Sequence, residues 1–98
     1  MTENPLRPVH PGEILREEFL APLALTPYAL AAVLHVPRTR IERLVREETP
    51  ATPDTALRLA RYFGTTAEFW LGIQARHDLE TVAADLADEL ATIAPRAA

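Results

Sequence analysis

The sequence predicts an all-α fold of five helices, the last of which extends beyond the others. Apolar residues recur at intervals of three and four through most of the chain, and no segment shows the alternation of a β-strand. Several of the periodic segments begin with Thr or Pro, which favour the starts of helices. A length of 98 residues with 48% hydrophobic composition suits one small domain with a single core.

Composition and charge exclude several classes of protein. The chain has no cysteine, so disulfide bonds and thiolate metal sites are not available. It has no apolar run of about 18 residues and no signal-peptide pattern, so we expect a soluble cytoplasmic protein that does not enter a membrane. Residues 1–46 hold six Arg and five Glu, whereas residues 47–98 hold four Arg and nine acidic residues. This balance argues against a general nucleic-acid coat but permits a sequence-specific reader with one basic face.

The N-terminal part predicts an arm followed by a first helix. Residues 1–9 show no periodicity and are predicted to be flexible. The first helix is expected to begin near Pro11 and to end near Pro22. Its inner face is assigned to Ile14, Leu15 and Phe19, with Leu20 and Leu23 as further candidates.

The stretch Thr26–Arg46 predicts two short helices joined by a tight corner. Thr26 is a good N-cap, and Pro37 ends the first helix and opens the second. The second helix turns Ile41, Leu44 and Val45 inward and leaves Arg38, Thr39, Arg40, Arg43 and Arg46 for its outer face. A helix, a short turn and a basic second helix form the helix-turn-helix layout, in which the second helix enters the DNA major groove.

Two further helices complete the chain. The fourth is predicted between the N-cap Thr52 and Gly64, with Ala56, Leu57, Ala60 and Phe63 buried. The fifth starts after Thr65 or Thr66 and contributes Phe69, Trp70 and Ile73 to the core. A single helix over about residues 66–92 and a break near Gly72 or Asp78 are both compatible with the pattern.

A second apolar stripe follows in the last helix, formed by Leu79, Val82, Leu86, Leu90 and Ile93. Such a stripe extends beyond a five-helix globule, so it needs another surface to bury it. It either folds back on its own core or packs against a second subunit. We expect a homodimer, with Leu79, Val82, Leu86 and Leu90 as its dimerisation residues.

Four sequence blocks in this order resemble the HigA (VapI-type) antitoxin branch of the Xre/Cro-like helix-turn-helix proteins. They are His10–Glu13, Val36–Ile41, Asp54–Ala60 and Glu68–Leu71, and the resemblance covers roughly residues 8–80. It implies a five-helix Xre/lambda-repressor-like domain that acts as a dimer. Residues 1–9 would then be an arm, residues 10–78 the DNA-binding domain and residues 79–98 a C-terminal helix extension for dimerisation.

The resemblance also implies two partners and two activities. Such proteins bind and neutralise a HigB-like toxin, which resembles RelE-type mRNA endonucleases, and they repress their own operon by binding its double-stranded operator DNA. The toxin-binding surface is not located by the sequence, although the N-terminal arm with the first helix is a candidate.

The resemblance assigns DNA contacts to both helices of the pair. Arginine side chains can pair bidentately with guanine, and residues in the first turns of the second helix face the bases. The groove-facing set is Arg38, Thr39, Arg40 and Arg43, and the backbone-facing set is Thr26, Pro27, Tyr28 and Arg46. The alternatives are a solvated face for the arginines and a cover over the core edge for Tyr28.

Four residues depart from the family pattern. Pro27 stands where the family usually has a polar residue, and His35 replaces a common Gly in the turn. Glu47 and Glu48 occupy a turn that is usually rich in Gly, Lys and Arg, so they place negative charge near the expected phosphates. The alternative functions are therefore a protein-interaction antitoxin with weakened DNA binding, or an orphan Xre-type regulator without a toxin.

We predict no enzyme, no metal and no cofactor. His10 and Glu13 are two ligand types without a third nearby, so a structural role at the helix start is favoured. The chain has only three glycines and no nucleophile or phosphate-loop motif. The acidic residues Asp78, Glu80, Asp85, Asp88 and Glu89 are expected to form a solvated face, with contact to a basic toxin as the alternative.

Overall fold

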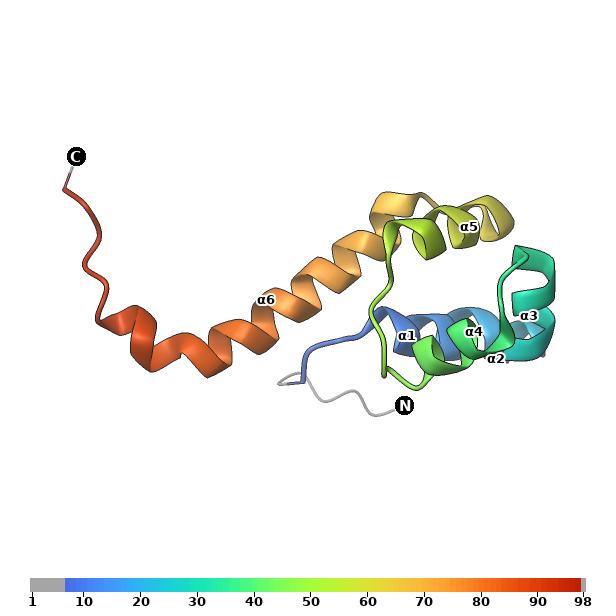
Figure 1. Cartoon of the computed structure of the whole chain (residues 1–98), viewed down its shortest axis with the longest axis horizontal. Coiled ribbons are helices and arrows are strands. Elements are labelled where there is room, and N and C mark those ends of the chain that lie inside the picture. Colours follow the sequence, from blue (N-terminus) through green and yellow to red (C-terminus); the bar gives the residue numbers. More distant parts are fainter. Residues whose placement is uncertain (1–6, 98) are drawn as a thin grey trace.

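The computed structural model describes residues 7–97 and confirms the all-α, five-helix architecture within them (Figure 1). The first helix is one continuous run of α1, a π-helical stretch η1, and α2. The bounds are α1 Pro11–Ile14, η1 Leu15–Leu20, α2 Ala21–Leu23, α3 Pro27–Leu34, α4 Arg38–Val45, α5 Pro53–Phe63 and α6 Ala67–Ala91. Most of the predicted N-terminal arm, residues 1–6, lies outside the described residues.

Threonine N-caps start three of the helices. The hydroxyls of Thr26, Thr52 and Thr66 each accept the backbone N–H three residues further on, at 3.0, 3.3 and 3.1 Å. Of the two candidates for the last helix, Thr66 is the cap. Thr65 instead accepts the indole N–H of Trp70 at 2.8 Å, so it anchors the largest core side chain. These bonds satisfy backbone N–H groups that a helix start leaves without partners.

The first four helices are each followed by a left-handed residue, and only one of these four residues is a glycine. Gly64 closes α5 with a φ of 77°, whereas Ala24, His35 and Glu47 adopt φ values of 50°, 61° and 63° after the first helix, α3 and α4. In each of these three turns the following N–H bonds back to a carbonyl of the last helical turn. The corners are therefore set by backbone hydrogen bonds rather than by glycine.

The first corner turns the chain sharply. The first helix and α3 meet at a bend of 97°. Together the two helices have the length and apolar composition of a broken membrane span. No single helix within residues 7–97 is long and apolar enough to cross a membrane.

A core of leucine, isoleucine and tryptophan side chains holds the five helices together. Its largest fully buried side chains are Trp70, Leu15, Leu30, Ile41, Leu44 and Leu59. The Phe19 ring lies 5.1 Å from that of Trp70 and 4.8 Å from that of Phe63, measured between centroids. This aromatic cluster joins the first helix, α5 and α6.

Two predicted core residues lie on the surface instead. Leu57 is 63% exposed and Phe69 is 41% exposed, whereas Leu59 and Trp70 are fully buried. On a helix Leu57 and Leu59 point about 160° apart, and Phe69 and Trp70 about 100° apart, so only one residue of each pair faces the neighbouring helices. Leu23, the weaker candidate on the first helix, is also exposed.

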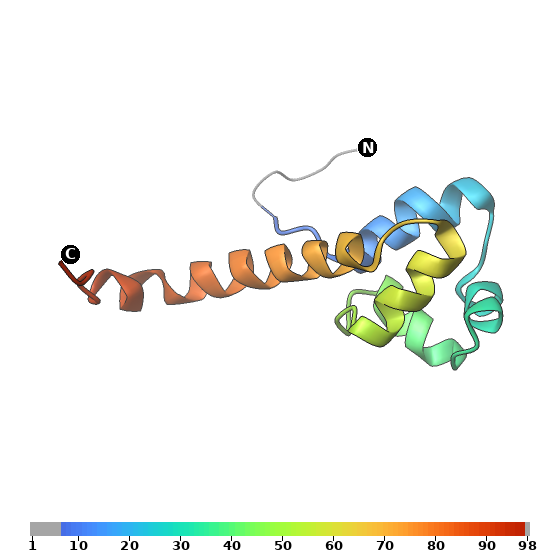
Figure 2. The ribbon, with the colours of Figure 1, turned by 90° about the horizontal axis from the view of Figure 1, so that it is seen from above.

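The last helix is continuous from Ala67 to Ala91, with no break at Gly72 or Asp78. Its first half packs on the globule through Trp70 and Gln74, and its second half projects away from it (Figures 1 and 2). The molecule therefore measures 52 × 30 × 22 Å. Residues 92–97 of the predicted extension follow the helix without forming part of it.

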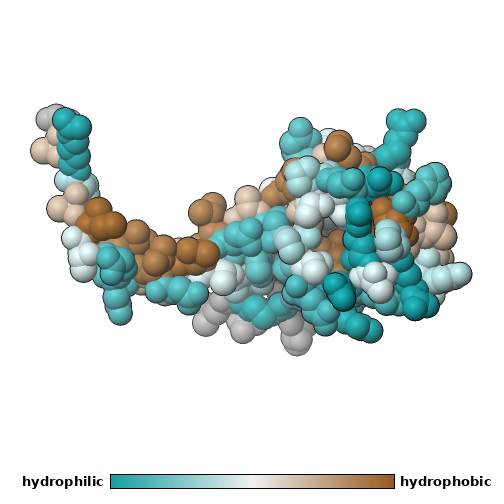
Figure 3. All heavy atoms as spheres, in the orientation of Figure 1, coloured by the Kyte–Doolittle hydropathy of each residue, from teal (hydrophilic) through white to brown (hydrophobic). Residues whose placement is uncertain are grey.

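The apolar stripe of α6 does not fold back on its own core. From Leu79 to the end of the helix every residue is exposed, and Figure 3 shows the apolar side chains gathered along the projecting half. Of the two alternatives for the stripe, the one in which it returns to its own globule is wrong. Covering of the stripe by a second subunit stays a prediction.

Candidate nucleic-acid interface

Helix α4 is held in the globule by one face and exposes the opposite face. Ile41, Leu44 and Val45 are buried, as predicted. The side chains that the sequence assigned to the groove and to the backbone from this helix are all exposed: Arg38, Thr39, Arg40, Arg43 and Arg46. At 100° per residue these exposed positions spread over an arc of about 200°, with Arg38 and Arg40 at its two edges.

Two of the positive charges of α4 lie at the end of the helix where its electrostatics disfavours them, whereas Arg43 lies in the favourable last turn. Arg38 and Arg40 lie in its first turn, which contains no acidic residue, and the N-cap Pro37 provides no side-chain cap. The N-terminal end of a helix carries partial positive charge, so it repels cations. Within α4 only Glu42 offsets this charge, through its ion pair with Arg38, so Arg40 takes its anionic partner from another helix.

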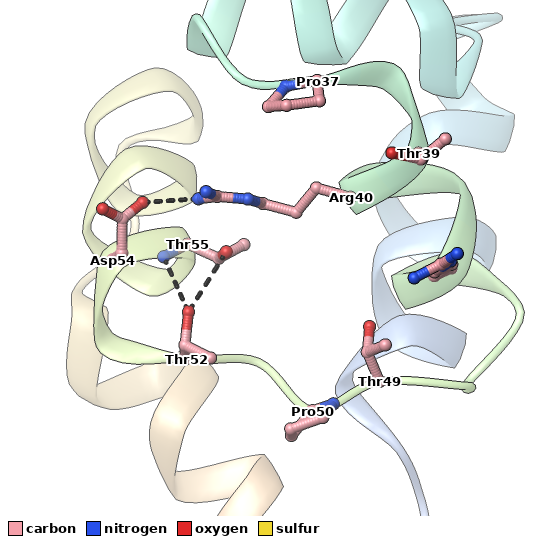
Figure 4. Close-up of a pocket in the computed structure, with 9 residues that line it drawn as sticks. Pro37, Thr39, Arg40, Thr49, Pro50, Thr52, Asp54 and Thr55 are labelled. Carbon is pink, nitrogen blue, oxygen red and sulfur yellow. Dashed lines mark hydrogen bonds and ion pairs between the residues drawn. The ribbon is translucent and has the colours of Figure 1, made fainter.

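Asp54, in the first turn of α5, is one such partner (Figure 4). Its Oδ1 atom accepts a hydrogen bond from Nη1 of Arg40 at 2.6 Å and another from Nε of Arg58 at 2.7 Å. These bonds, first that from Arg58 and then that from Arg40, lower the pKa of Asp54 below its ordinary value. Arg58 in turn donates from Nη1 to the carbonyl of Leu34 at 2.8 Å, at the end of α3.

A groove of about 430 Å³ separates α4 from the start of α5, and Arg40 spans it (Figure 4). Four threonine hydroxyls and two arginines line this groove. The lining residues are Pro37, Thr39, Arg40, Arg43, Thr49, Pro50, Thr52, Asp54 and Thr55. The sequence assigned only Thr39, Arg40 and Arg43 to the interface. For Asp54, its i,i+4 spacing to Arg58 was the available signal.

The other assigned residues lie at the surface around α4. Arg38 pairs with Glu42 one turn on, at 3.3 Å, whereas Arg43 and Arg46 form no ion pair within residues 7–97. At the start of α3, Tyr28 is 65% exposed. Thr26 and Pro27 share a shallow surface pocket with Val45, so the start of α3 lies beside the end of α4.

An arginine of the first helix partly neutralises the acidic turn after α4. The carboxylate of Glu47 lies 3.4 Å from the guanidinium of Arg16, which also donates to the carbonyl of Val45. Hydrogen bonds to Glu17 and then to Glu47 raise the pKa of Arg16. Glu48 is exposed, so of the two glutamates it is the one whose charge faces solvent.

His10 takes the structural role that the sequence favoured. It is buried, and its Nδ1 accepts the N–H of Gly12 at 2.9 Å as the N-cap of the first helix. Glu13 pairs with Arg7 at 2.9 Å. No group of three or more potential ligand side chains in the described part of the chain is arranged to hold a metal ion.

Lowering the pH is expected to destabilise the protein through His10. Burial, and then the neighbouring His77, lower its pKa below the ordinary value of 6.5, while Glu47, Asp78 and a hydrogen bond to the Thr49 backbone oppose the shift. The unfolded chain therefore binds the proton more readily. The contribution of His10 is fully present above about pH 6.5 and decreases below it, by at most about 1.4 kcal/mol per pH unit.

Urea unfolding between pH 7.5 and pH 5 measures this dependence. His10→Asn retains an N-cap without a titrating ring, so it is expected to make the stability less dependent on pH. The control His35→Asn removes an exposed histidine and should leave the pH dependence unchanged. An equally steep dependence in His10→Asn would assign the effect to other groups.

Comparisons with known proteins agree with this geometry. The helix-turn-helix family (HTH_3) matches residues 15–70. Virulence-associated protein I of Dichelobacter nodosus is 51% identical over 83 residues, which cover 85% of this chain and 77% of that protein. Antitoxin HigA-1 of Vibrio cholerae is 40% identical over 79 residues, covering 81% of this chain and 74% of that protein. The structure of the Pseudomonas aeruginosa antitoxin HigA with the higBA promoter has a TM-score of 0.89 at 41% identity, over 93% of this chain and 100% of that chain.

Proposed function

The chain belongs to the HigA (VapI-type) antitoxin branch of the helix-turn-helix family, and we propose that it binds operator DNA and neutralises a toxin. The observation that carries the DNA-binding half is the exposed basic face of α4, which is anchored by three buried apolar residues. The family is one of DNA-binding regulators and antitoxins rather than of enzymes.

In this proposal α4 is the recognition helix and lies in the major groove of the operator. Arg38, Thr39, Arg40 and Arg43 face the base edges, where an arginine pairs bidentately with guanine. Thr26, Pro27, Tyr28 and Arg46 lie along the backbone. The Thr26 hydroxyl accepts the N–H of Ala29, and its own hydrogen stays available to a phosphate. Binding to the operator would place the protein in the cytoplasm with the DNA.

The second part of the proposal is a homodimer. Residues 10–78 would form the DNA-binding domain, and the extension over residues 79–98 would pair through Leu79, Val82, Leu86 and Leu90. These side chains are between 40% and 71% exposed, so the projecting half of α6 has an apolar stripe without cover in the described residues. A two-fold dimer would present two α4 helices about 34 Å apart, one turn of DNA, to a palindromic operator.

The third part is the toxin, for which we propose a HigB-like, RelE-type mRNA endonuclease. The support is that two of the similar proteins, antitoxin HigA-1 and antitoxin HigA, are named as antitoxins. The first helix and the N-terminal arm are the candidate surface, and the acidic face of α6 is the alternative. Co-purification with the product of the adjacent gene tests this part, and a neighbourhood without a small basic toxin gene would favour an orphan regulator.

Alanine at Arg38, Arg40 and Arg43 together is expected to weaken promoter binding by at least about 100-fold. Each lost bidentate pair costs about 1–3 kcal/mol of base discrimination. All three side chains are exposed, so the fold should be retained. A mobility-shift assay with the chain's own promoter, repeated over a salt series, measures the effect.

The matched control is Arg61→Ala, which removes an exposed arginine of α5 outside the proposed interface. Promoter binding by the triple variant at the affinity of the parent would show that α4 is not the recognition helix. Absence of promoter binding by the parent itself, with toxin binding intact, would favour the protein-interaction antitoxin, for which the exposed charge of Glu48 is the supporting observation.

A further inference from the structure

We propose that Asp54 is a positioning residue for operator recognition, because it holds Arg40 in the orientation in which that side chain reads a base. The inference rests on the proposed function, since it requires α4 to lie in the major groove. It adds to that function a specificity-determining residue on a different helix, fourteen positions further along the chain.

The geometry is a chain of bonded groups that ends on the backbone. Arg40 donates from Nη1 to Oδ1 of Asp54 at 2.6 Å, and the same oxygen accepts Nε of Arg58 at 2.7 Å. Arg58 is fixed by the carbonyl of Leu34 at 2.8 Å. The position of Arg40 thus depends on α3, the first helix of the helix-turn-helix pair, and on the first turn of α5.

The Arg40 side chain would not keep one conformation without such a partner. Its long side chain has many rotamers, and the positive end of α4 repels its charge. The bond to Asp54 uses Nη1, so donors on Nη2 and Nε remain unpaired in the described residues. Two parallel donors on a fixed guanidinium match the O6 and N7 acceptors of guanine.

The charge of Asp54 has a second effect, which separates specific from non-specific binding. Its carboxylate is more than half exposed at the mouth of the groove between α4 and α5 (Figure 4). A negative charge there repels phosphates, and the ion pair keeps Arg40 from reaching them. Asp54 therefore lowers the affinity for DNA of unrelated sequence and so raises the affinity ratio in favour of a duplex with a guanine at the correct position.

The variant Asp54→Asn tests this with two duplexes, the chain's own promoter and a scrambled duplex of equal length and composition. We expect the ratio of the two affinities to fall about tenfold. Affinity for the scrambled duplex should rise severalfold, and its salt dependence should steepen by about one phosphate contact. A fold defect would instead weaken binding to both duplexes.

Three further variants complete the design. Glu68→Gln removes one exposed acidic charge from α6 and should leave the ratio unchanged. Arg40→Lys keeps the charge but lacks the planar fork, so it should lose discrimination as Asp54→Asn does. In an Arg40→Ala background, Asp54→Asn should have no further effect on the ratio.

The outcomes separate the two proposals. If the parent binds the promoter and Asp54→Asn leaves the affinity ratio unchanged, or lowers both affinities equally, the positioning role is overturned. If the parent does not discriminate between the duplexes at all, the proposed operator binding fails first.

Discussion

Replacement of Gly12 by Ala is expected to destabilise the protein by about 3 kcal/mol or more. A Cβ at Gly12 would overlap the main-chain carbonyl oxygen of Leu44, and would lie 2.8 Å from the carbonyl carbon. These are backbone atoms of α4, so no side-chain rotation can relieve the clash. Overpacking of a core typically costs 1–3 kcal/mol, and a clash between two main chains lies at or beyond the top of that range.

The same change is expected to weaken promoter binding, because α4 must shift away from the first helix. Urea unfolding and the promoter mobility shift measure the two effects. Gly72→Ala is the matched control: a Cβ there meets no atom within 4 Å, and alanine favours a helix interior by up to about 1 kcal/mol. A Gly12→Ala variant as stable as the parent would show that the first helix and α4 are not in this backbone contact.

Replacement of Leu86 by Asp is expected to convert the proposed homodimer into a monomer. Leu86 lies at the middle of the α6 stripe. In a two-fold interface each subunit contributes its own Leu86, so one substitution introduces two carboxylates. Burial of each leucine is worth about 1.5–3 kcal/mol, and a buried carboxylate adds a desolvation cost. We therefore expect the dissociation constant of the dimer to rise by at least about 100-fold.

Sedimentation velocity at micromolar concentration measures the oligomeric state. Ala84→Asp introduces the same charge on the opposite side of α6, about 160° away at 100° per residue, and should leave the dimer intact. Operator binding by Leu86→Asp should also weaken, because one dimer no longer links two half-sites. A Leu86→Asp variant as dimeric as the parent would exclude this stripe as the interface.

Local signals allowed the helices to be predicted well. The Thr–Pro pairs at Thr26 and Thr52 define helix starts through hydrogen bonds that span only three residues. Such bonds depend on the adjacent sequence alone, so they can be recognised without the fold. The helix-turn-helix pair and the exposed face of α4 were predicted for the same reason.

Long-range contacts were not accessible in the same way. The interaction of Asp54 with Arg40 and that of Gln74 with the N–H of Ala51 join residues 14 and 23 positions apart. Asp54 and Gln74 are residue types that are common on protein surfaces, so neither type indicates a long-range contact. The burial of Leu59 in place of Leu57, by contrast, was accessible from the sequence, because Ala56, Leu59, Ala60 and Phe63 follow the i, i+3, i+4, i+7 spacing of one helix face.

The continuity of α6 has a consequence for the amount of folded protein. Leu79–Ala91 buries no side chain against the globule, so it is held as a helix only by its own backbone hydrogen bonds and by continuity with the packed first half of α6. In a separate subunit this segment would fray from its free end, and open backbone is the substrate of proteases. Association would hold it helical by mass action. A cell that makes more of this chain would therefore also hold a larger fraction of it beyond the reach of degradation.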